Sequence, residues 1–204
     1  MHIDTFHRIV RILDRTLPLP LHGRVVPLVG GWAMRRVPDR RFLERRILPW
    51  LVSMRPGRVL FVGTSRIPDT RSYHQAYDWG ATEFWTMDID PGAARWGGDR
   101  HQCGDIRTAR EYFPAEWFDC IILNGVLGWG VDEEADQERA LEQCRAISRA
   151  GAVLVLGWNT STCQDPRKLA MLAKHYEDCA ASDLPVRKRF AETDHVFDLL
   201  TARQ

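Results

Sequence analysis

The residues of this 204-residue chain that are best suited to chemistry are small or acidic and follow short apolar runs. Gly63, Thr64 and Ser65 come directly after one such run, and small residues let a backbone approach a ligand closely and donate amide hydrogen bonds. Asp88 lies 25 residues beyond Gly63 and is followed by Ile89. An acid at about this spacing holds the hydroxyl groups of a ribose. The pattern therefore predicts a nucleoside-binding site.

Each of these features also has a plainer explanation. An ordinary strand-to-helix turn would account for the small residues around Gly63. Asp88 or Asp90 would simply cap a helix that begins at Pro91. Asp90 suits the capping position better, because it directly precedes the proline, and this leaves Asp88 for the ribose.

Two later apolar runs also end in polar or small residues. Gly104, Asp105 and Ile106 form a GDI sequence, in which the carboxylate would accept a hydrogen bond from an exocyclic adenine amine while the isoleucine covers the ring. A surface turn is the alternative. Asn124 and Gly125 end the next run, where the amide side chain would face a cleft or cap a loop.

The apolar runs alternate with helical stretches from residue 58 onward, which predicts a mostly parallel sheet with helices on both faces. Only four residues separate the last two strand-like runs, so these must be antiparallel neighbours. Strands are predicted at 58–64, 83–90, 101–106, 118–126, 152–159, 185–190 and 195–202, and helices at 71–80, 92–97, 108–113, 133–149 and 166–181. Ligands of such sheets bind beyond the carboxyl ends of the strands, where the strand order reverses.

The segment 1–57 precedes this alternating pattern and is basic, with twelve arginines against four acids before Val59. Helical spacing of apolar residues predicts helices at 4–17 and 39–54, which we interpret as a helical cap on the domain 58–204. This segment would cover a substrate pocket. Alternatively, its arginines would contact an anionic membrane surface or hold a phosphorylated, lipid-linked substrate, or they would simply face solvent.

The composition narrows the classes of partner. Lys and Arg (28) nearly balance Asp and Glu (27), so the overall charge does not favour nucleic acid. The sequence has no apolar run long enough for a membrane span and no signal peptide, and its five cysteines form no CxxC pair, which favours a reducing, cytoplasmic compartment. Since no His, Cys or Asp cluster has ligand spacing, we expect no metal site. The sequence leaves open whether the protein forms a homodimer.

In their order along the chain, these motifs resemble the class I S-adenosylmethionine-dependent methyltransferases over Arg58 to Arg203. RVLFVGT resembles the family's glycine motif, WTMDIDP its ribose motif, GDI its adenine motif, FDCIILNGV its fourth motif, RAGAVLVLGWN the segment before its fifth strand, and HVFDLLTA its antiparallel seventh strand. GVLGWGVD is similar to a little-characterised bacterial branch. The resemblance implies an α/β, Rossmann-like three-layer sandwich, with a mostly parallel seven-stranded sheet that ends in an antiparallel hairpin.

The resemblance also implies S-adenosylmethionine as the cofactor and assigns roles to residues. Gly63 and its neighbours would approach the methionine part, Asp88 would bind the ribose, and Asn124 would line the cleft. Asp105 and Ile106 would contact the adenine.

The chain departs from the family pattern in the first of these motifs. Phe61 stands where the family usually has an acid, and Ser65 and Ile67 stand where it repeats glycine. Asp69 would then hold the methionine ammonium, and Arg66 its carboxylate.

Methyl transfer needs little catalytic machinery beyond alignment and, for a hydroxyl acceptor, removal of a proton. Tyr73 and His74 are the predicted catalytic residues, with His101 and Asp132 as further candidates and Trp129 as an aromatic wall of the cleft. The expected function is methyl transfer to a small-molecule, natural-product, glycan or lipid-linked acceptor. The alternatives are a methyltransferase-like scaffold without activity and a nicotinamide-dependent oxidoreductase, which the missing GxGxxG disfavours.

Overall fold

A computed structural model describes residues 37–64, 73–180 and 183–204. The predicted helix at 4–17 lies outside these residues, as do Ser65, Arg66, Ile67 and Asp69. The helical elements are α3 (Pro38–Phe42), η1 (Leu43–Ile47), α4 (Leu48–Ser53), α5 (Tyr73–Ala76), η2 (Pro91–Ala93), α6 (Ala94–Gly97), η3 (Ile106–Glu111), α7 (Glu134–Ile147), η4 (Pro166–Lys168) and α8 (Ala170–His175). The strands are β1 (Arg58–Val62), β2 (Glu83–Asp88), β3 (His101–Cys103), β4 (Phe118–Asn124), β5 (Ser148–Asn159), β6 (Tyr176–Asp178), β7 (Arg187–Arg189) and β8 (His195–Ala202).

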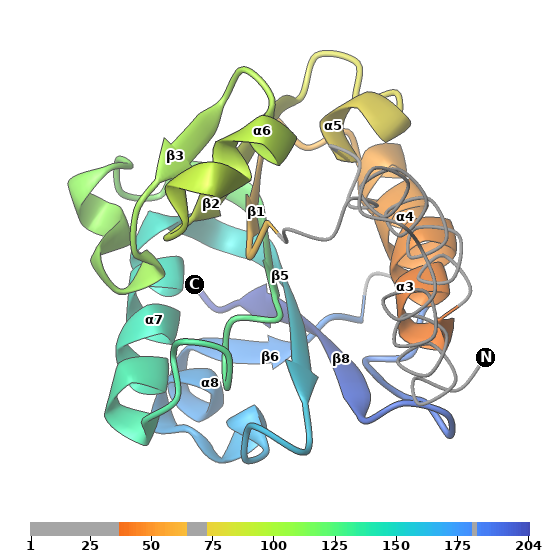
Figure 1. Cartoon of the computed structure of the whole chain (residues 1–204), viewed down its shortest axis with the longest axis vertical. Helices are drawn as coiled ribbons and strands as arrows, with labels where there is room; N and C mark the ends of the chain where they lie inside the picture. Colours follow the sequence, from red (N-terminus) through yellow and green to blue (C-terminus); the bar gives the residue numbers. More distant parts are fainter. Residues whose placement is uncertain (1–36, 65–72, 181–182) are drawn as a thin grey trace, which may run out of the picture.

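One sheet organises the described residues, in the order β3-β2-β1-β4-β5-β8-β6, with β7 also paired to β8. The first five strands pair in parallel, and β8 runs antiparallel to β5, β6 and β7. The predicted antiparallel pairing of the last two strands is therefore confirmed. Figure 1 shows the sheet between two layers of helices, with α7 and α8 on one face and α3 and α4 on the other.

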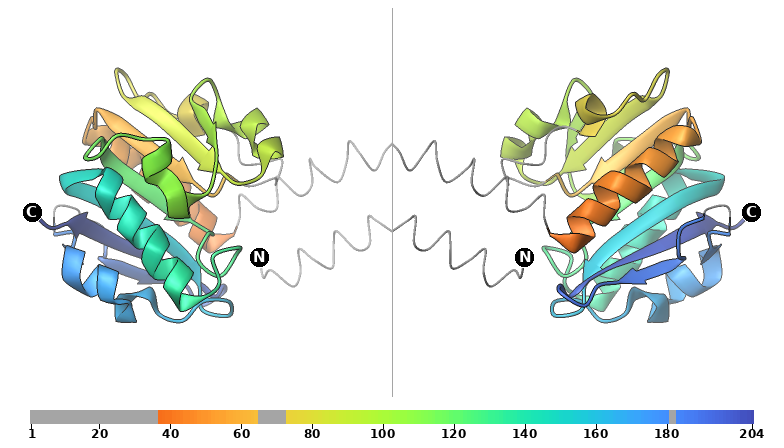
Figure 2. Two further views of the ribbon diagram at one scale, coloured as in Figure 1. Left: turned by 90° about the vertical axis from the view of Figure 1, so that its left-hand side faces the viewer. Right: turned by 90° about the vertical axis from the view of Figure 1, so that its right-hand side faces the viewer.

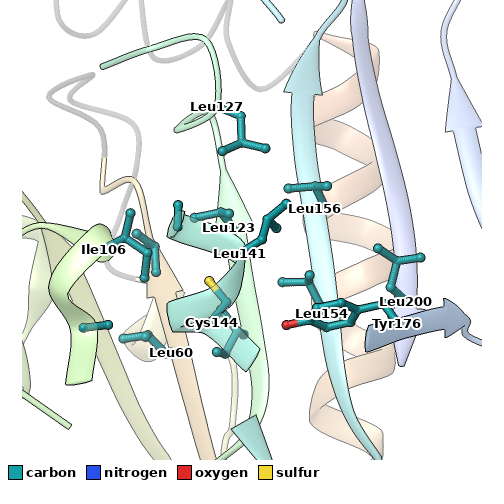
Figure 3. Close-up of a cluster of buried hydrophobic side chains, with 14 of the residues drawn as sticks. Leu60, Ile106, Leu123, Leu127, Leu141, Cys144, Leu154, Leu156, Tyr176 and Leu200 are labelled. Carbon is teal, nitrogen blue, oxygen red and sulfur yellow. The ribbon is translucent and has the colours of Figure 1, made fainter. Parts of the chain in front are cut away.

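The alternation of side chains along each strand divides the core into two clusters. On one face, Leu60, Leu123 and Leu154 pack with Leu141 and Cys144 of α7 (Figure 3). On the other face lie their strand neighbours, together with apolar residues of the helix at 38–53: Val59, Phe61, Ile122, Val153, Val155, Leu43, Ile47, Leu48 and Leu51. Both faces of the central strands are thus buried, as the apolar sequence of these strands predicts.

The predicted helix at 39–54 is present as three consecutive helical elements, α3, η1 and α4. Ile47, Leu48 and Leu51 are fully buried against the sheet. Figure 2 shows this helix and α7 lying across opposite faces of the sheet. The helix therefore forms part of one layer of the sandwich, while the division of the chain at residue 58 stays a prediction.

The structure differs from the sequence-based expectations in two places. The sheet has eight strands within the described residues rather than seven, because Tyr176–Asp178 leaves the predicted helix at 166–181 and pairs with the end of β8. The helix predicted at 133–149 ends at Ile147, and β5 begins at the next residue. Ser148 already has extended dihedral angles, and its neighbours continue as a strand.

Candidate functional site

The strand order reverses between β1 and β4, since β2 and β3 follow β1 on one side and β4 and β5 lie on the other. A pocket opens at the carboxyl ends of these strands and encloses about 530 Å³, part of it solvent at the mouth. Its lining consists of Val62, Gly63, Asp88, Ile89, Gly104, Asp105, Ile106, Gly125, Val126, Trp129, Gly130 and Val131. Seven of the ten predicted cofactor-binding residues are among them.

Gly63 brings the backbone of the first loop against β4. Its φ is +90°, and a Cβ atom at this position would lie 2.2 Å from the carbonyl oxygen of Asn124. Only glycine fits, because the conformation disfavours other residues and the neighbouring atom belongs to the backbone. The backbone after β1 therefore approaches the end of β4 closely beside the pocket, which Gly63 lines.

Asp88 places a half-buried carboxylate at the end of β2. Burial, and less strongly the nearby Asp90 carboxylate, raise the pKa of Asp88 above its usual value. Backbone amides of Asp90 (2.9 Å) and Thr64 donate to Asp88. A carboxylate can accept about four hydrogen bonds, so about two positions are left for a ligand such as a ribose diol.

Asp90 performs the capping role that the sequence predicts. Its side chain accepts a hydrogen bond of 3.0 Å from the amide of Gly92 at the start of η2. Asp88 is therefore not needed as the helix cap, and its carboxylate lines the pocket.

Asp105 is more heavily engaged than the sequence indicates. Its carboxylate accepts from the amide of Arg107 (2.8 Å) and is paired with the Arg107 guanidinium at 2.6 Å. The hydrogen bonds from Arg107 lower the pKa of Asp105. Arg107 also pairs with Asp136 of α7 at 2.6 Å. Asp105 thus fixes η3 against α7 and keeps limited capacity for the predicted adenine contact.

The walls of the pocket carry unusually exposed apolar side chains. Ile89 is 66% exposed and Trp129 is 63% exposed, although large apolar side chains are normally covered in a soluble domain. Tyr112, which is also exposed, packs on Gly104, where a Cβ atom would lie 2.7 Å from the ring. The pocket therefore offers apolar surfaces beside the Asp88 carboxylate, which suits a flat heteroaromatic ring attached to a sugar.

The loop 125–131, which contributes the Trp129 side of the pocket, is held by a residue that sequence reasoning missed. Gln137 is buried in α7 and donates to the carbonyl groups of Val131 (3.3 Å) and Asp132 (3.0 Å). The amide of Gly128 closes the loop by donating to Val131 at 2.9 Å. A buried glutamine on the apolar face of a helix is the signal that could have indicated this role.

Two of the predicted cofactor-binding residues, Thr64 and Asn124, lie beside the pocket rather than in its lining. Asn124 is the last residue of β4, and Thr64 lies two residues beyond the end of β1. The Asn124 amide lies over Gly157 of β5, where a Cβ atom would be 2.0 Å from Oδ1 of Asn124. Phe61, which replaces the usual acid, belongs to the core cluster beneath the helix at 38–53. The centroid of its ring lies 5.3 Å from that of Tyr73.

The predicted catalytic residues are not in the pocket lining. Tyr73 is buried, and its hydroxyl donates to Glu44 at 3.2 Å, so its contacts favour a structural role. The His74 ring lies over Gly98 and near Phe84.

The two further candidates are also engaged elsewhere. Thr86 and Nδ1 of His101 are 2.9 Å apart, and burial lowers the pKa of His101. Asp132 accepts from the Gly130 amide at 3.1 Å. Within the described residues, no group of three or more His, Cys, Asp and Glu side chains is placed to hold a metal ion, and no helix there is long and apolar enough to cross a membrane.

Proteins of known structure share this fold. No protein-family model and no curated protein sequence matches the chain. Among solved structures, it is similar to the N-methyltransferase NodS from Bradyrhizobium japonicum WM9 with S-adenosyl-L-homocysteine (TM-score 0.60, 15% identity, 86% of this chain and 93% of NodS). It is also similar to the 1,6-didemethyltoxoflavin-N1-methyltransferase of Burkholderia thailandensis (TM-score 0.52, 19% identity, 92% of this chain and 91% of that enzyme). A third similar structure is that of the T. thermophilus 16S rRNA N2 G1207 methyltransferase RsmC (TM-score 0.55, 14% identity, 83% of this chain and 40% of RsmC). The chain has the class I methyltransferase fold.

Proposed function

We propose that this protein transfers a methyl group from S-adenosylmethionine to a small-molecule acceptor. The observation that carries the proposal is the half-buried Asp88 carboxylate, with acceptor positions left over, in a pocket at the point where the strand order reverses. Similar structures were solved with S-adenosylhomocysteine or S-adenosylmethionine.

The residues of the pocket fit this cofactor. Asp88 would accept hydrogen bonds from the two ribose hydroxyls, and Ile89 and Ile106 would enclose the adenine. Gly63 would allow the methionine part to lie against the backbone. When bound, S-adenosylmethionine supplies an electrophilic methyl group on a sulfonium, and the protein's part is to orient the acceptor and exclude water.

A small acceptor fits the charge of the chain better than RNA does. Binding to a phosphate backbone is driven by an excess of Lys and Arg, whereas the formal net charge here is only +1 at pH 7, because acids in the rest of the chain offset the arginines of segment 1–57. The similarity to RsmC covers only 40% of that protein, while NodS and the toxoflavin enzyme are covered almost completely. We therefore favour a small molecule or a natural-product intermediate as the acceptor.

Calorimetry with S-adenosylhomocysteine tests the cofactor part of the proposal. The intact chain should bind this product at about micromolar strength. Asp88→Ala should weaken binding at least about 100-fold, because a charged acceptor of two hydroxyl donors is lost. The matched control is Asp99→Ala, which removes an exposed aspartate outside the pocket and should leave the affinity unchanged.

The outcome also separates an enzyme from an inactive scaffold. No heat at about millimolar ligand would exclude the cofactor and with it the enzyme. Binding of S-adenosylhomocysteine without release of this product from S-adenosylmethionine, when the protein is supplied with a broad panel of hydroxyl- and amine-bearing compounds, would favour the scaffold. The buried Phe61 in place of the usual acid is the observation that supports the inactive scaffold as a second candidate function.

A further inference from the structure

A group of polar side chains lies at the same sheet edge as the pocket but two strands farther on. Asn159 is the last residue of β5 and is paired in register with His195, the first residue of β8. Asp194 immediately precedes His195. Since neighbouring strands are about 5 Å apart, His195 lies roughly 10 Å along the edge from the end of β4, where Gly125 lines the pocket.

Asp194 sets the orientation of the Asn159 amide. Burial would raise the pKa of Asp194, but hydrogen bonds from Ser161 and Asn159 together lower it, so the carboxylate is ionised and can only accept. The Nδ2 group of Asn159 donates to Asp194 at 2.8 Å. The Oδ1 atom of Asn159 must therefore point the other way, toward His195.

This orientation in turn sets the tautomer of His195. Nδ1 of His195 lies 3.2 Å from Oδ1 of Asn159, which can only accept, so Nδ1 carries the proton and donates. Nε2 is then left with its lone pair. It is buried and has no hydrogen-bond partner among the residues that the structure describes, and the residue as a whole is only 8% exposed.

The surroundings keep His195 neutral. Burial lowers its pKa, and this effect outweighs the opposing carboxylates of Asp39 and Asp194, while Arg40 acts in the same direction as burial. The ring also packs edge-on against Phe197, with centroids 4.6 Å apart. A neutral imidazole with a free Nε2 is a base at neutral pH.

Two other buried polar atoms that have no partner among the described residues lie at this sheet edge. They are Oδ1 of Asn124, at the end of β4, and Oγ1 of Thr64, just after β1. Buried polar atoms without partners destabilise a fold, and they are few in native proteins. A ligand bound beside the pocket would supply the missing hydrogen bonds of Thr64, Asn124 and His195.

We infer that Thr64, Asn124 and His195 form the acceptor subsite, and that it takes a neutral small molecule bearing hydroxyl or amine groups. The inference rests on the proposed function. Nε2 of His195 accepts the proton of the hydroxyl or amine that is methylated. As the bond from this oxygen or nitrogen to the methyl carbon forms, its bond to hydrogen breaks and the proton moves to Nε2. The carbon–sulfur bond breaks, and its electron pair stays on sulfur. Asp194 and Asn159 are positioning residues.

Nitrogen NMR of the full chain, labelled with ¹⁵N-histidine and saturated with S-adenosylhomocysteine, tests this inference. The resonances of His195 are identified by their loss in His195→Gln. We expect a neutral ring protonated only at Nδ1, and a mixture of tautomers in Asn159→Ala. Phenol, added as a neutral hydroxyl probe, should shift the Nε2 resonance of His195 toward the hydrogen-bonded position. The other six histidines serve as internal controls.

A proton on Nε2, or an Nε2 resonance that phenol does not move, would overturn the inference. Calorimetry separates this result from a failure of the proposed function. His195→Gln should bind S-adenosylhomocysteine within about twofold of the unaltered chain, because His195 lies outside the cofactor pocket. If the unaltered chain bound no S-adenosylhomocysteine, the proposed function itself would fail.

Discussion

Two groups of polar side chains near the carboxyl edge of the sheet differ in how completely they are paired. Asp198 of β8 is fully buried, yet its Oδ1 atom is held by Arg187 (2.7 Å) and Arg167 (2.8 Å) and its Oδ2 atom by Trp158 (2.9 Å). Arg187 also binds Asp165 through two contacts of 2.7 Å, which holds the pKa of Asp165 at about 2. Every charge in this group has a partner.

The other group lies on the pocket side of the edge and is incompletely paired. Within the part of the chain that the structure describes, Asp88 is desolvated and has acceptor capacity left, and Asn124 and His195 each keep a buried atom without a partner. A closed ionic network stabilises one geometry, whereas open hydrogen-bonding positions cost stability unless a ligand fills them. The comparison indicates that binding belongs to the second group and structural support to the first.

The largest effect is expected from breaking the closed network. Asp198→Ala removes the buried acceptor that two guanidinium groups and an indole N–H share, so the free energy of unfolding should fall by about 3–5 kcal/mol. Urea denaturation measures this decrease in the free energy of unfolding. Asp178→Ala removes an exposed partner of Arg167 and should cost about 1 kcal/mol or less. Equal losses in the two variants would contradict the contrast between the groups.

Gly63→Ala should have the next largest effect. The new Cβ atom would meet the Asn124 carbonyl at 2.2 Å in a left-handed conformation, which should lower the free energy of unfolding by about 2–3 kcal/mol and weaken S-adenosylhomocysteine binding as well. Gly125→Ala is the control, because φ is +64° but no atom of the described residues lies within 4 Å of the new Cβ atom, so a loss of about 1 kcal/mol is expected. Chemical denaturation measures the free energy of unfolding of both variants, and calorimetry measures their affinity for S-adenosylhomocysteine.

Trp129→Ala should affect binding without affecting stability. The indole is 63% exposed in the pocket wall, so the unfolding midpoint should change little, while affinity for S-adenosylhomocysteine should fall about tenfold. If thermal unfolding shifted strongly and calorimetry showed unchanged affinity, Trp129 would belong to the structural side of the comparison.

The smallest effect concerns pH. Burial lowers the pKa of His195 and of His101 below the value of about 6.5 in the unfolded chain. The folded protein therefore binds fewer protons than the unfolded one as the pH falls below about 6.5, and stability present above this pH is lost on acidification. Denaturation at about pH 7.5 and about pH 5.5 should differ by about 1 kcal/mol per histidine or less, and His195→Gln should retain only the His101 part.

The sequence predicts much of the fold because the strongest signals are local. Alternating apolar runs indicate the strands, and the spacing from Gly63 to Asp88 indicates one sheet edge. Strand β6 was missed because its three residues follow a helical pattern directly and pair with β8, more than twenty residues later.

The partnerships within the site are harder to predict from sequence. Asn159 and His195 are 36 residues apart and meet only through the register of β5 with β8. Similarly, Arg107 binds Asp136 of α7, and Gln137 holds the loop 125–131, through contacts that no local pattern indicates. Residue type therefore indicates which side chains can react, and long-range pairing determines which of them meet.

The outer side of β8 also bears on self-association. Two strands of three residues each, β6 and β7, share this side, where a single long strand would otherwise run. They carry Glu177, Asp178, Arg187, Lys188 and Arg189. Short, charged border strands of this kind offer an incoming chain few consecutive backbone groups to join. We therefore expect that copies of this protein do not merge into a continuous intermolecular sheet through this border.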